Sequence, residues 1–302
     1  MLLERNTMIE KFKKYLVKAQ SPAYPPYHTG PYLEEYFLYY YFKNIEKFKN
    51  VKHQYIPVLW TELYLHVASL VDDLQNDLNE LDKDKFYFTV SQHDDAPFQQ
   101  LPPNTINFSA GGNQPNTTPI PLICSPITDV KEVEKDIFCS FVGSITAPLE
   151  GWGLVSHNLR MKMLETLVDK KEYVLKPKSW TNEVKKDRQD MFLDLTARSK
   201  FTLCPRGYGA TSFRLYEAMQ LKSVPVYIYY EKPHLPFVDR INWNDICVLI
   251  NIDDIGKLDD TLKNISNEKY ANMVKTMQET YQKYFTLEGM CNGILETLEN
   301  IK

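Results

Sequence analysis

The sequence is most informative in the stretch Phe201-Thr-Leu-Cys-Pro-Arg-Gly-Tyr-Gly-Ala-Thr-Ser-Phe-Arg-Leu-Tyr-Glu-Ala-Met219, which leads to Val224-Pro-Val-Tyr-Ile-Tyr-Tyr230. The apolar run Phe201–Cys204 predicts a buried strand, and Val224–Tyr230 predicts the next strand. Between them, two glycines indicate a turn, and a helix is expected to begin after Thr211 or Ser212 and to end near Lys222. Strand, glycine loop, helix and strand together predict a βαβ unit.

The loop of this unit predicts an anion site. Unpaired backbone N–H groups and the helix dipole both favour negative charge at a helix N-terminus. Arginine suits bidentate phosphate contact, and glycine lets the backbone approach a ligand closely. The candidate phosphate-binding residues are Arg206, Gly207, Gly209, Thr211, Ser212 and Arg214. Glu217 follows on the same helix, where its carboxylate could accept hydrogen bonds from a ribose diol. Arg214 and Glu217 are three residues apart, so a surface ion pair is the alternative interpretation.

Two common nucleotide motifs do not fit this loop. The lysine of a P-loop is missing, and no third glycine completes the pattern of a dinucleotide-binding fold. The loop therefore predicts a phosphate site of another kind.

Composition limits the remaining classes. The 302 residues favour two domains, and 43% hydrophobic with 25% charged residues is typical of a globular protein. A net charge of −4 gives no reason to expect a nucleic-acid partner. The five cysteines are far apart and indicate neither a zinc site nor a disulfide framework. The first 20 residues are too charged for a signal peptide or a membrane span, so we expect a cytoplasmic protein without an integral membrane segment.

Strands alternate with helices in both halves of the chain, which predicts two doubly wound α/β domains facing each other. A charged segment near residue 132 suggests the boundary, with residues 1–132 forming one domain and residues 133–302 the other. The last helix, about 287–301, could cross back to the first domain. In the first domain a strand is expected at 85–91, a loop at 101–118 and a short strand at 120–124.

Several segments of the second half resemble the exostosin family of glycosyltransferases. The resemblance rests on Phe201-x-Leu-Cys-Pro-x-Gly, on Ser212-x-Arg214-x-x-Glu217-Ala218 and on Val224-Pro225-Val226. Further similar pieces are Phe138–Gly143, Arg160 with its neighbours, and Pro236-Phe237 with Trp243. The similarity covers about residues 137–285, whereas the first half matches only in layout.

The resemblance implies a GT-B fold whose C-terminal domain binds a nucleotide sugar and whose N-terminal domain binds a glycan acceptor. Family donors are usually UDP-sugars. By the same resemblance, Glu217 would hold the ribose, and Ser212, Arg214 and the loop amides would hold the diphosphate. Arg206 and Arg160 are further candidates for the diphosphate. The implied function is transfer of a sugar, such as xylose, to a hydroxyl group of a glycan.

An inverting and metal-independent transfer is expected, with a protein base that deprotonates the acceptor. Asp94, Asp95 and His93 follow a predicted strand at the edge where α/β sheets bind ligands, so one of them is the expected base. Glu34 and His28 are the next candidates, although ordinary turns or surface charge would explain all of these residues equally well. Acceptor binding is expected at Tyr24, Tyr27, His28 and Tyr32, whose aromatic rings could stack on sugars. The triplet Asp82-Lys83-Asp84 is interpreted as a solvated turn, so no metal or other cofactor is expected.

Two departures from the family pattern matter. Lys222-Ser223 stands where the family commonly has glycine, and a left-handed lysine would cost roughly 1 kcal/mol, so a turn of different shape is expected. No membrane anchor is visible, which suggests a short soluble member from a microbe or an algal virus. Two other functions stay open: another nucleotide-sugar enzyme such as an epimerase, and a non-catalytic module that binds glycans or nucleotides.

Overall fold

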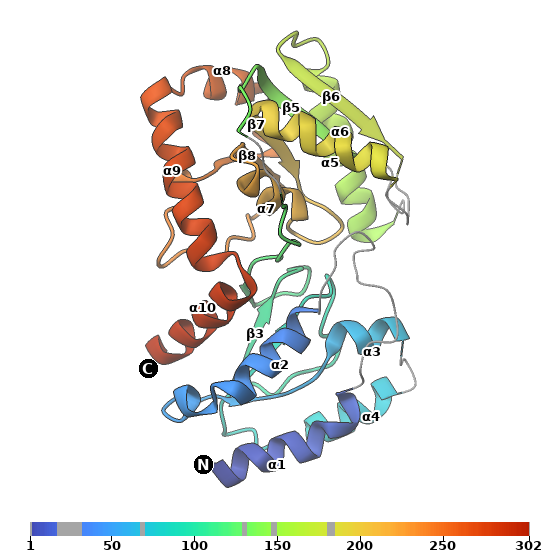
Figure 1. Cartoon of the computed structure of the whole chain (residues 1–302). Coiled ribbons are helices and arrows are strands. Elements are labelled where there is room, and N and C mark those ends of the chain that lie inside the picture. The colour runs from blue at the N-terminus through green and yellow to red at the C-terminus, as the bar shows by residue number, and fades with distance from the viewer. Residues whose placement is uncertain are drawn as a thin grey trace. The chain divides into compact units, whose positions relative to one another are not determined.

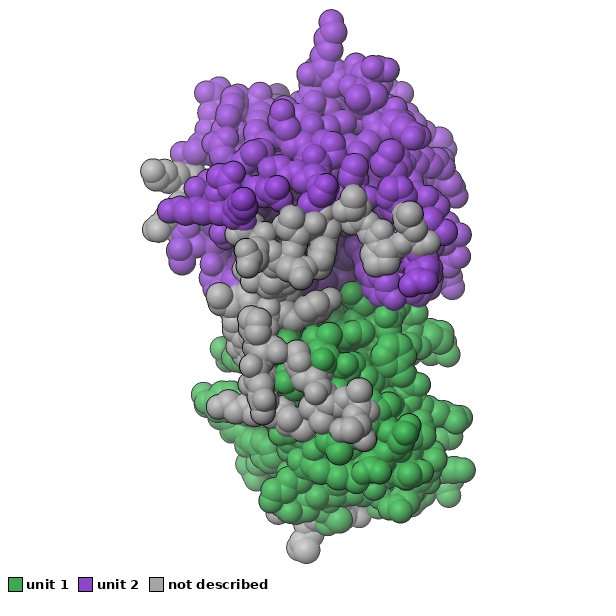
Figure 2. All heavy atoms as spheres, turned by 90° about the vertical axis from the view of Figure 1, so that its right-hand side faces the viewer, with its two compact units in different colours: residues 1–24, 29–121, 286–302 green, residues 25–28, 122–285 purple. Residues whose placement is uncertain are grey.

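The structure, a computed structural model, describes residues 2–16, 32–66, 70–128, 132–145, 150–179 and 185–301. These residues form two compact units (Figure 2). The first unit comprises the described residues up to 121 and from 286 onward, and the second comprises those from 122 to 285. The chain thus changes units before the expected position near residue 132. Helix α10 (Leu287–Asn300) belongs to the first unit, so the chain returns to it at the end.

The first unit contains a sheet of four parallel strands in the order β1-β2-β3-β4, of which β3 is labelled in Figure 1. Its strands are β1 (Gln54–Tyr55), β2 (Tyr87–Ser91), β3 (Thr105–Ser109) and β4 (Thr117–Pro119). Its other helices are α1 (Leu2–Phe12), α2 (Leu33–Lys43), α3 (Trp60–His66) and α4 (Val71–Asn79), with short 3-10 turns η1 (Lys13–Tyr15) and η2 (Ile45–Phe48).

Aromatic side chains fill much of this unit's interior. Phe37 of α2 packs edge-on against Phe88 of β2, with ring centroids 5.9 Å apart, and Tyr55 stacks on Phe88 at 5.1 Å. Tyr41 and Phe48 are also buried and contact the same rings. The many tyrosines in the first 60 residues therefore serve largely as core material.

The expected loop at 101–118 is wrong, because it contains β3 and most of β4. Phe108 is fully buried, and β3 pairs with β2 along all five residues of both strands. Proline, asparagine and glycine around this segment suggested a loop, but pairing with a buried neighbour outweighs local propensity. The strand expected at 120–124 is likewise absent, since β4 ends at Pro119.

The second unit contains a five-stranded parallel sheet in the order β6-β5-β7-β8-β9. Its strands are β5 (Ile137–Ser144), β6 (Tyr173–Lys178), β7 (Ser199–Pro205), β8 (Val224–Tyr229) and β9 (Val248–Asn251). Its helices are α5 (Gly151–Leu167), α6 (Lys186–Arg198), α7 (Phe213–Gln220), α8 (Leu258–Lys263) and α9 (Asn267–Tyr284), with 3-10 turns η4 (Trp243–Asp245) and η5 (Ile252–Lys257). Each unit combines a parallel sheet with helices, which confirms the predicted α/β class. A GT-B fold is built from two units of this kind.

The predicted βαβ unit is present as β7, α7 and β8. Its strands are buried because their apolar residues, among them Leu203, Val226 and Ile228, join one core with Phe141 of β5. The turn before β8 has the left-handed shape that a glycine would give, since Lys222 adopts φ +53°. Its N–H donates to the Met219 carbonyl and the N–H of Ser223 to the Ala218 carbonyl, a Schellman closure of the helix. The expectation of a differently shaped turn is therefore wrong.

Candidate functional site

The order of the strands in the sheet of the second unit indicates where a ligand would bind. From β5 the chain passes to β6 on one side and then to β7 on the other, so the order reverses between β5 and β7. Ligands of open α/β sheets bind beyond the carboxyl ends of the strands at such a reversal. Here the carboxyl ends of β5 and β7 lead to Gly143-Ser144 and to the glycine loop that begins at Arg206. The loop singled out in the sequence thus lies where this topology favours a ligand.

Arg160 joins the two sides of the reversal. Its Nη1 donates to the Ser144 carbonyl at 2.5 Å, and its Nε and Nη2 donate to the Arg206 carbonyl at 3.2 and 3.1 Å. Arg160 comes from α5, which follows β5 directly. These bonds fix the ends of β5 and β7 to one another, and they give Arg160 a supporting role as well as positive charge near the loop.

The glycine loop is anchored on both flanks. The Gly207 N–H donates to the Thr211 carbonyl at 2.8 Å, and the Arg206 N–H donates to the Ile228 carbonyl of β8 at 3.0 Å. The Tyr227 hydroxyl donates to the Ala210 carbonyl and accepts the His234 N–H. A loop held in this way keeps its amide groups in place before a ligand arrives.

Arg206 is a less accessible residue than the sequence suggested. Only 3% of it is exposed. Its guanidinium lies 4.7 Å from the ring centre of Trp152, and Nη2 donates to the Tyr208 carbonyl at 3.0 Å. Arg206 therefore stabilises its own loop, while Gly207, Gly209 and Thr211 supply the backbone at the site.

Arg214 is the arginine best suited to an anion. Its guanidinium is stacked between Phe141 of β5 at 5.5 Å and Phe192 of α6 at 5.2 Å. Its Nε is buried and makes no hydrogen bond. A buried donor without a partner is unfavourable, so this N–H group is suited to donate to a ligand oxygen. Phe192 was not recognised as part of the site from the sequence, since it lies on a different helix.

Because Gly143 has no side chain, the guanidinium of Arg214 can lie directly against it. A Cβ atom on Gly143 would lie 2.6 Å from Nη1 of Arg214 and 3.1 Å from its Cζ. Any other residue at the end of β5 would push the guanidinium aside. The sequence placed Gly143 at a strand end, but only the structure gives it this role.

Ser212 is the N-cap of α7, with φ −152° and ψ 135°, as expected. Its carbonyl accepts the Leu215 N–H at 3.1 Å, whereas its hydroxyl makes no capping hydrogen bond. Helix N-terminal amides and a hydroxyl that does not cap them can both serve an anion. This geometry is compatible with the phosphate role expected for Ser212.

Glu217 lies one turn further along α7. Burial raises the pKa of its carboxyl group, and the positive charge of Arg214 acts in the opposite direction. A carboxylate kept in a poorly solvated place gains from donors such as ribose hydroxyls. The charge of Arg214 thus acts on Glu217 from the same helix, at a carboxyl group that is partly buried and not fully exposed at the surface.

Glu34 of α2 is fully buried in the first unit. Its Oε1 accepts three hydrogen bonds: from the Thr61 N–H at 3.1 Å, the Thr61 hydroxyl at 2.6 Å and the Gln92 N–H at 2.9 Å. Its Oε2 is buried and makes no hydrogen bond. Burial raises the pKa of this carboxyl, although the hydrogen bonds oppose the shift. These observations favour a structural role for Glu34 over that of a base.

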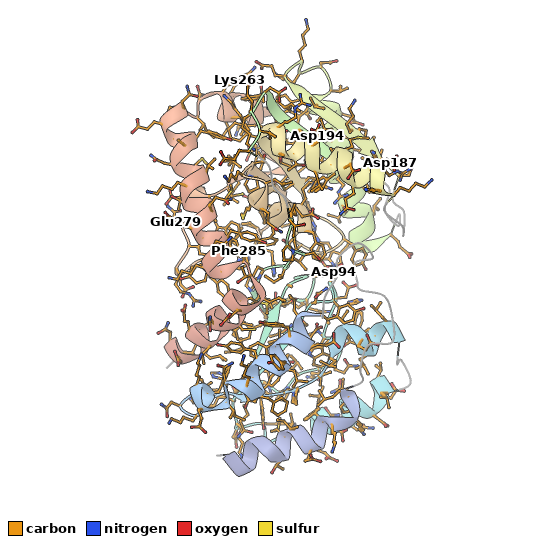
Figure 3. All side chains as sticks on the ribbon, viewed as in Figure 1. Asp94, Asp187, Asp194, Lys263, Glu279 and Phe285 are labelled. Atoms are coloured by element: carbon orange, nitrogen blue, oxygen red, sulfur yellow. The ribbon has the colours of Figure 1, made fainter. Side chains whose placement is uncertain are left out.

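His93, Asp94 and Asp95 follow β2, at the carboxyl edge of the first unit's sheet (Asp94 is labelled in Figure 3). The His93 Nδ1 accepts the Asp95 N–H at 3.2 Å, so the proton of the neutral ring is on Nε2. Burial lowers the pKa of His93, which favours that neutral form. Because its unprotonated nitrogen already accepts a hydrogen bond from the Asp95 N–H, His93 is not well placed to take a proton from an acceptor.

The two aspartates are held by the segment after β3. The Asn113 N–H donates to the Asp94 carbonyl at 3.0 Å, and the Asn113 side chain donates to Oδ1 of Asp95 at 2.9 Å. A Cβ on Gly111 would lie 2.2 Å from the Asp94 Cα atom, so only glycine allows this packing. The strand β3, which the sequence did not reveal, thus positions the candidate base.

The structure does not support acceptor binding by Tyr32, and the other residues expected to bind acceptor are not described. Tyr24, Tyr27 and His28 lie outside the described residues. Tyr32 is only 4% exposed, so its ring is core material and offers no face to a sugar. At Asp82-Lys83-Asp84, all three residues are exposed and the Asp84 N–H donates to Asp82 Oδ1, which confirms a solvated turn.

Within the described ranges, none of the helices has the length and apolar character needed to cross a bilayer. In the same residues, no three side chains of metal-binding type lie together.

Comparison with known proteins identifies relatives of the second unit. The sequence pattern of the Exostosin GT47 domain matches residues 112–265, which is about half of the chain. A probable glycosyltransferase of Arabidopsis thaliana is 34% identical over 96 residues, which are 32% of this chain and 20% of that protein. A probable glucuronoxylan glucuronosyltransferase of the same plant, IRX7, is 35% identical over 83 residues, 28% of this chain and 18% of that protein. The chain thus matches about a fifth of the length of these curated relatives.

A longer but weaker match exists in rice. A probable glucuronosyltransferase of Oryza sativa is 29% identical over 147 residues, 48% of this chain and 32% of that protein. Among solved structures, the crystal structure of TarM covers 77% of this chain and 58% of its own, with a TM-score of 0.38 and 12% identity. The pneumococcal O-GlcNAc transferase GtfA covers 76% of this chain and 47% of its own, with a TM-score of 0.39 and 14% identity.

Proposed function

Because this chain belongs to the exostosin GT47 family, we propose that it is a glycosyltransferase that moves a sugar from a nucleotide-sugar donor to a hydroxyl group of a glycan. The observation that carries the proposal is the site at the strand-order reversal. There Arg214, with its unpaired buried Nε, lies beside the N-terminus of α7, and Glu217 follows on the same helix. A cation, a helix N-terminus and a carboxylate in this order fit a diphosphate linked to a ribose.

We propose that Arg214, Ser212 and the amides of the glycine loop bind the diphosphate, and that Glu217 accepts hydrogen bonds from the ribose hydroxyls. Arg160 and Arg206 add positive charge and hold the loop. These groups would stabilise the charge that develops on the leaving diphosphate without a metal ion. UDP is the nucleotide we propose, in agreement with the family resemblance.

The donor sugar is the finer question. Relatives are named as glucuronosyltransferases, which makes UDP-glucuronic acid a donor to test beside UDP-xylose. The relative named for glucuronoxylan suggests xylan-type acceptors. We propose Asp94 or Asp95 as the base of an inverting transfer, because both are partly exposed and follow β2 at the carboxyl edge of its sheet.

A thermal-shift screen with UDP-glucuronic acid, UDP-xylose, UDP-glucose and GDP-mannose tests the donor site. A ligand that binds only the folded protein raises its stability by RT ln(1 + [L]/Kd), so a concentration of a hundred times Kd adds about 2.7 kcal/mol. We expect a shift with UDP and at least one UDP-sugar, unchanged by EDTA, and none with GDP-mannose. If no nucleotide shifts the wild-type protein, the donor-site assignment fails.

The same preparation separates the alternative functions. Release of UDP that rises when an oligosaccharide is added supports transfer, whereas interconversion of UDP-sugars without an acceptor would indicate an epimerase. Donor binding with neither reaction would indicate a non-catalytic module. Asp94→Asn and Asp95→Asn should retain the UDP shift, and one of them should abolish transfer.

A further inference from the structure

Phe98 in the first unit is an exposed aromatic ring in a well-supported position. It follows the segment that carries His93, Asp94 and Asp95, and 59% of it is exposed. Single exposed apolar residues are common on protein surfaces and need a further reason before a role is assigned. Here that reason lies in how the ring is held and in what surrounds it.

The backbone and the ring of Phe98 are both fixed. Its N–H donates to the Tyr64 hydroxyl at 2.7 Å, and that hydroxyl donates to the Gln99 side chain at 2.5 Å. The Tyr64 ring meets Phe98 edge-on, with centroids 4.6 Å apart at 67°. His93 supports Phe98 from 6.1 Å in a similar orientation. Phe98 remains 59% exposed beside these two rings, and it needs no ordering before it binds a partner.

Polar side chains are connected to this ring through His93, which contacts both Phe98 and the backbone of Asp95. Asp95 is held in turn by the Asn113 side chain and, through its carbonyl, by the Gln114 amide at 2.7 Å. An imidazole in contact with the ring is thus followed by a carboxylate and two side-chain amides in fixed positions.

We propose that Phe98 is a stacking platform for a sugar ring of the acceptor glycan. A pyranose with equatorial hydroxyl groups has C–H bonds on its faces and hydroxyls around its rim. Its face can stack on the exposed ring of Phe98. The hydroxyls at its rim can form hydrogen bonds with the Nε2–H group of His93 and with the nearby carboxylate and amide side chains. This inference rests on the proposed function, because it places acceptor beside the candidate bases Asp94 and Asp95.

Binding of neutral oligosaccharides tests the platform. The probes are xylotetraose, cellotetraose and β-1,4-galactotetraose, and saturation-transfer NMR titration of the full chain gives their affinities. We expect at least one to bind the wild type, and Phe98→Ala to weaken it about tenfold. Phe98→Tyr should retain binding, because it keeps the ring face. Phe98→Leu should behave like Phe98→Ala, because it keeps only apolar bulk.

Phe42→Ala is the matched control, since Phe42 is also an exposed phenylalanine of this unit, at 44%. It should leave oligosaccharide binding unchanged. Equal binding by Phe98→Ala and the wild type, full binding by Phe98→Leu, or no binding of any probe to the wild type would each overturn the platform. The UDP thermal shift is measured on every variant and should not change. If UDP does not shift the wild-type protein, the donor-site proposal fails. Oligosaccharide binding, in contrast, tests only the role of Phe98.

Discussion

The guanidinium of Arg214 lies against the backbone of Gly143, so close that a Cβ on Gly143 would be 2.6 Å from Nη1. Gly143 is the second-last residue of β5 and Arg214 is the second residue of α7, two elements separated by two strands and two helices in the chain. The contact exists because β5 and β7 are neighbours in the sheet. It connects the architecture of the unit directly to the proposed diphosphate site.

Gly143→Ala should therefore impair donor binding more than stability. The nearest clashing atom belongs to the movable end of an arginine, so the guanidinium can shift. Cζ of the buried Phe141 ring at 3.1 Å must also give way slightly, so the expected loss of stability is about 1 kcal/mol. Since that shift removes a charged partner of the diphosphate, we expect UDP affinity to fall at least tenfold, about 1.4 kcal/mol. Isothermal calorimetry measures it. Gly256→Ala is the control, because a Cβ there meets nothing within 4 Å. Equal UDP affinity in both variants would contradict the proposed role of Arg214.

Glu217→Ala should lose UDP binding without losing stability. Burial raises the pKa of this carboxyl, which means that holding it ionised in the folded protein is unfavourable. Its removal is then expected to leave the unfolding temperature without ligand within a few degrees of wild type, while the UDP shift disappears. Glu279→Ala is the matched control, because Glu279 is an exposed carboxylate on α9 of the same unit (Figure 3). A full UDP shift in Glu217→Ala would rule out ribose binding by this residue.

Glu34 should make the stability of the protein depend on pH. Burial raises its folded pKa above the ordinary value of 4.5, so the folded state binds more protons than the unfolded state as pH rises above about 4.5. Its contribution to stability is therefore complete below that pH and is lost as pH rises through the folded pKa. Glu34→Gln cannot ionise and should reduce the decline, which urea unfolding between pH 4 and pH 8 would reveal.

The geometry of these hydrogen bonds predicts that the folded protein tolerates Glu34→Gln. The amide oxygen can take the place of Oε1, which accepts all three hydrogen bonds from Thr61 and Gln92. Glu34→Ala leaves those donors without an acceptor and should cost about 2–4 kcal/mol. If Glu34→Gln retains transfer activity, Glu34 is not the base. Identical pH curves for wild type and Glu34→Gln would contradict the raised pKa.

Lys222→Gly should stabilise the second unit by up to about 1 kcal/mol, because glycine adopts positive φ without the strain that lysine meets at +53°. The variant also loses an exposed ion pair with Glu132 at 2.9 Å, which contributes little. Lys222→Ala keeps the backbone strain and loses the same pair, so it serves as the control. Thermal unfolding should rank glycine above lysine and alanine; a glycine variant below alanine would show that the turn is unstrained.

In the second unit the sequence predicted β7, α7 and β8, although not β6. The apolar run at Phe201 and the Val-Pro-Val run at Val224 appear as β7 and β8, and Ser212 caps the helix between them. These features depend on neighbouring residues: side-chain periodicity, the conformational freedom of glycine, and the preference of serine for a helix start. The family resemblance rested on the same local pattern and is supported by the match to the GT47 domain.

The first unit shows where such reasoning ends. The residues of β3 lack a strong strand signal, and they form a strand because β2 and β4 lie on either side of them. Likewise Tyr32 and Glu34 looked accessible in a loop and helix start, yet both are buried. The burial of these two residues results from packing between distant segments, so the local pattern did not indicate it.

By itself, then, the sequence determined a βαβ unit, the loop proposed to bind an anion, and the placing of Ser212, Arg214 and Glu217 at the start and along one helix. Tertiary structure decided which of the arginines keeps a donor available. Arg160 and Arg206 donate to the carbonyls of the strand ends and the loop, whereas Arg214 keeps a buried Nε without a partner. The physical reason is the sheet order, which places Gly143 of β5 beside α7 and leaves space there for one guanidinium.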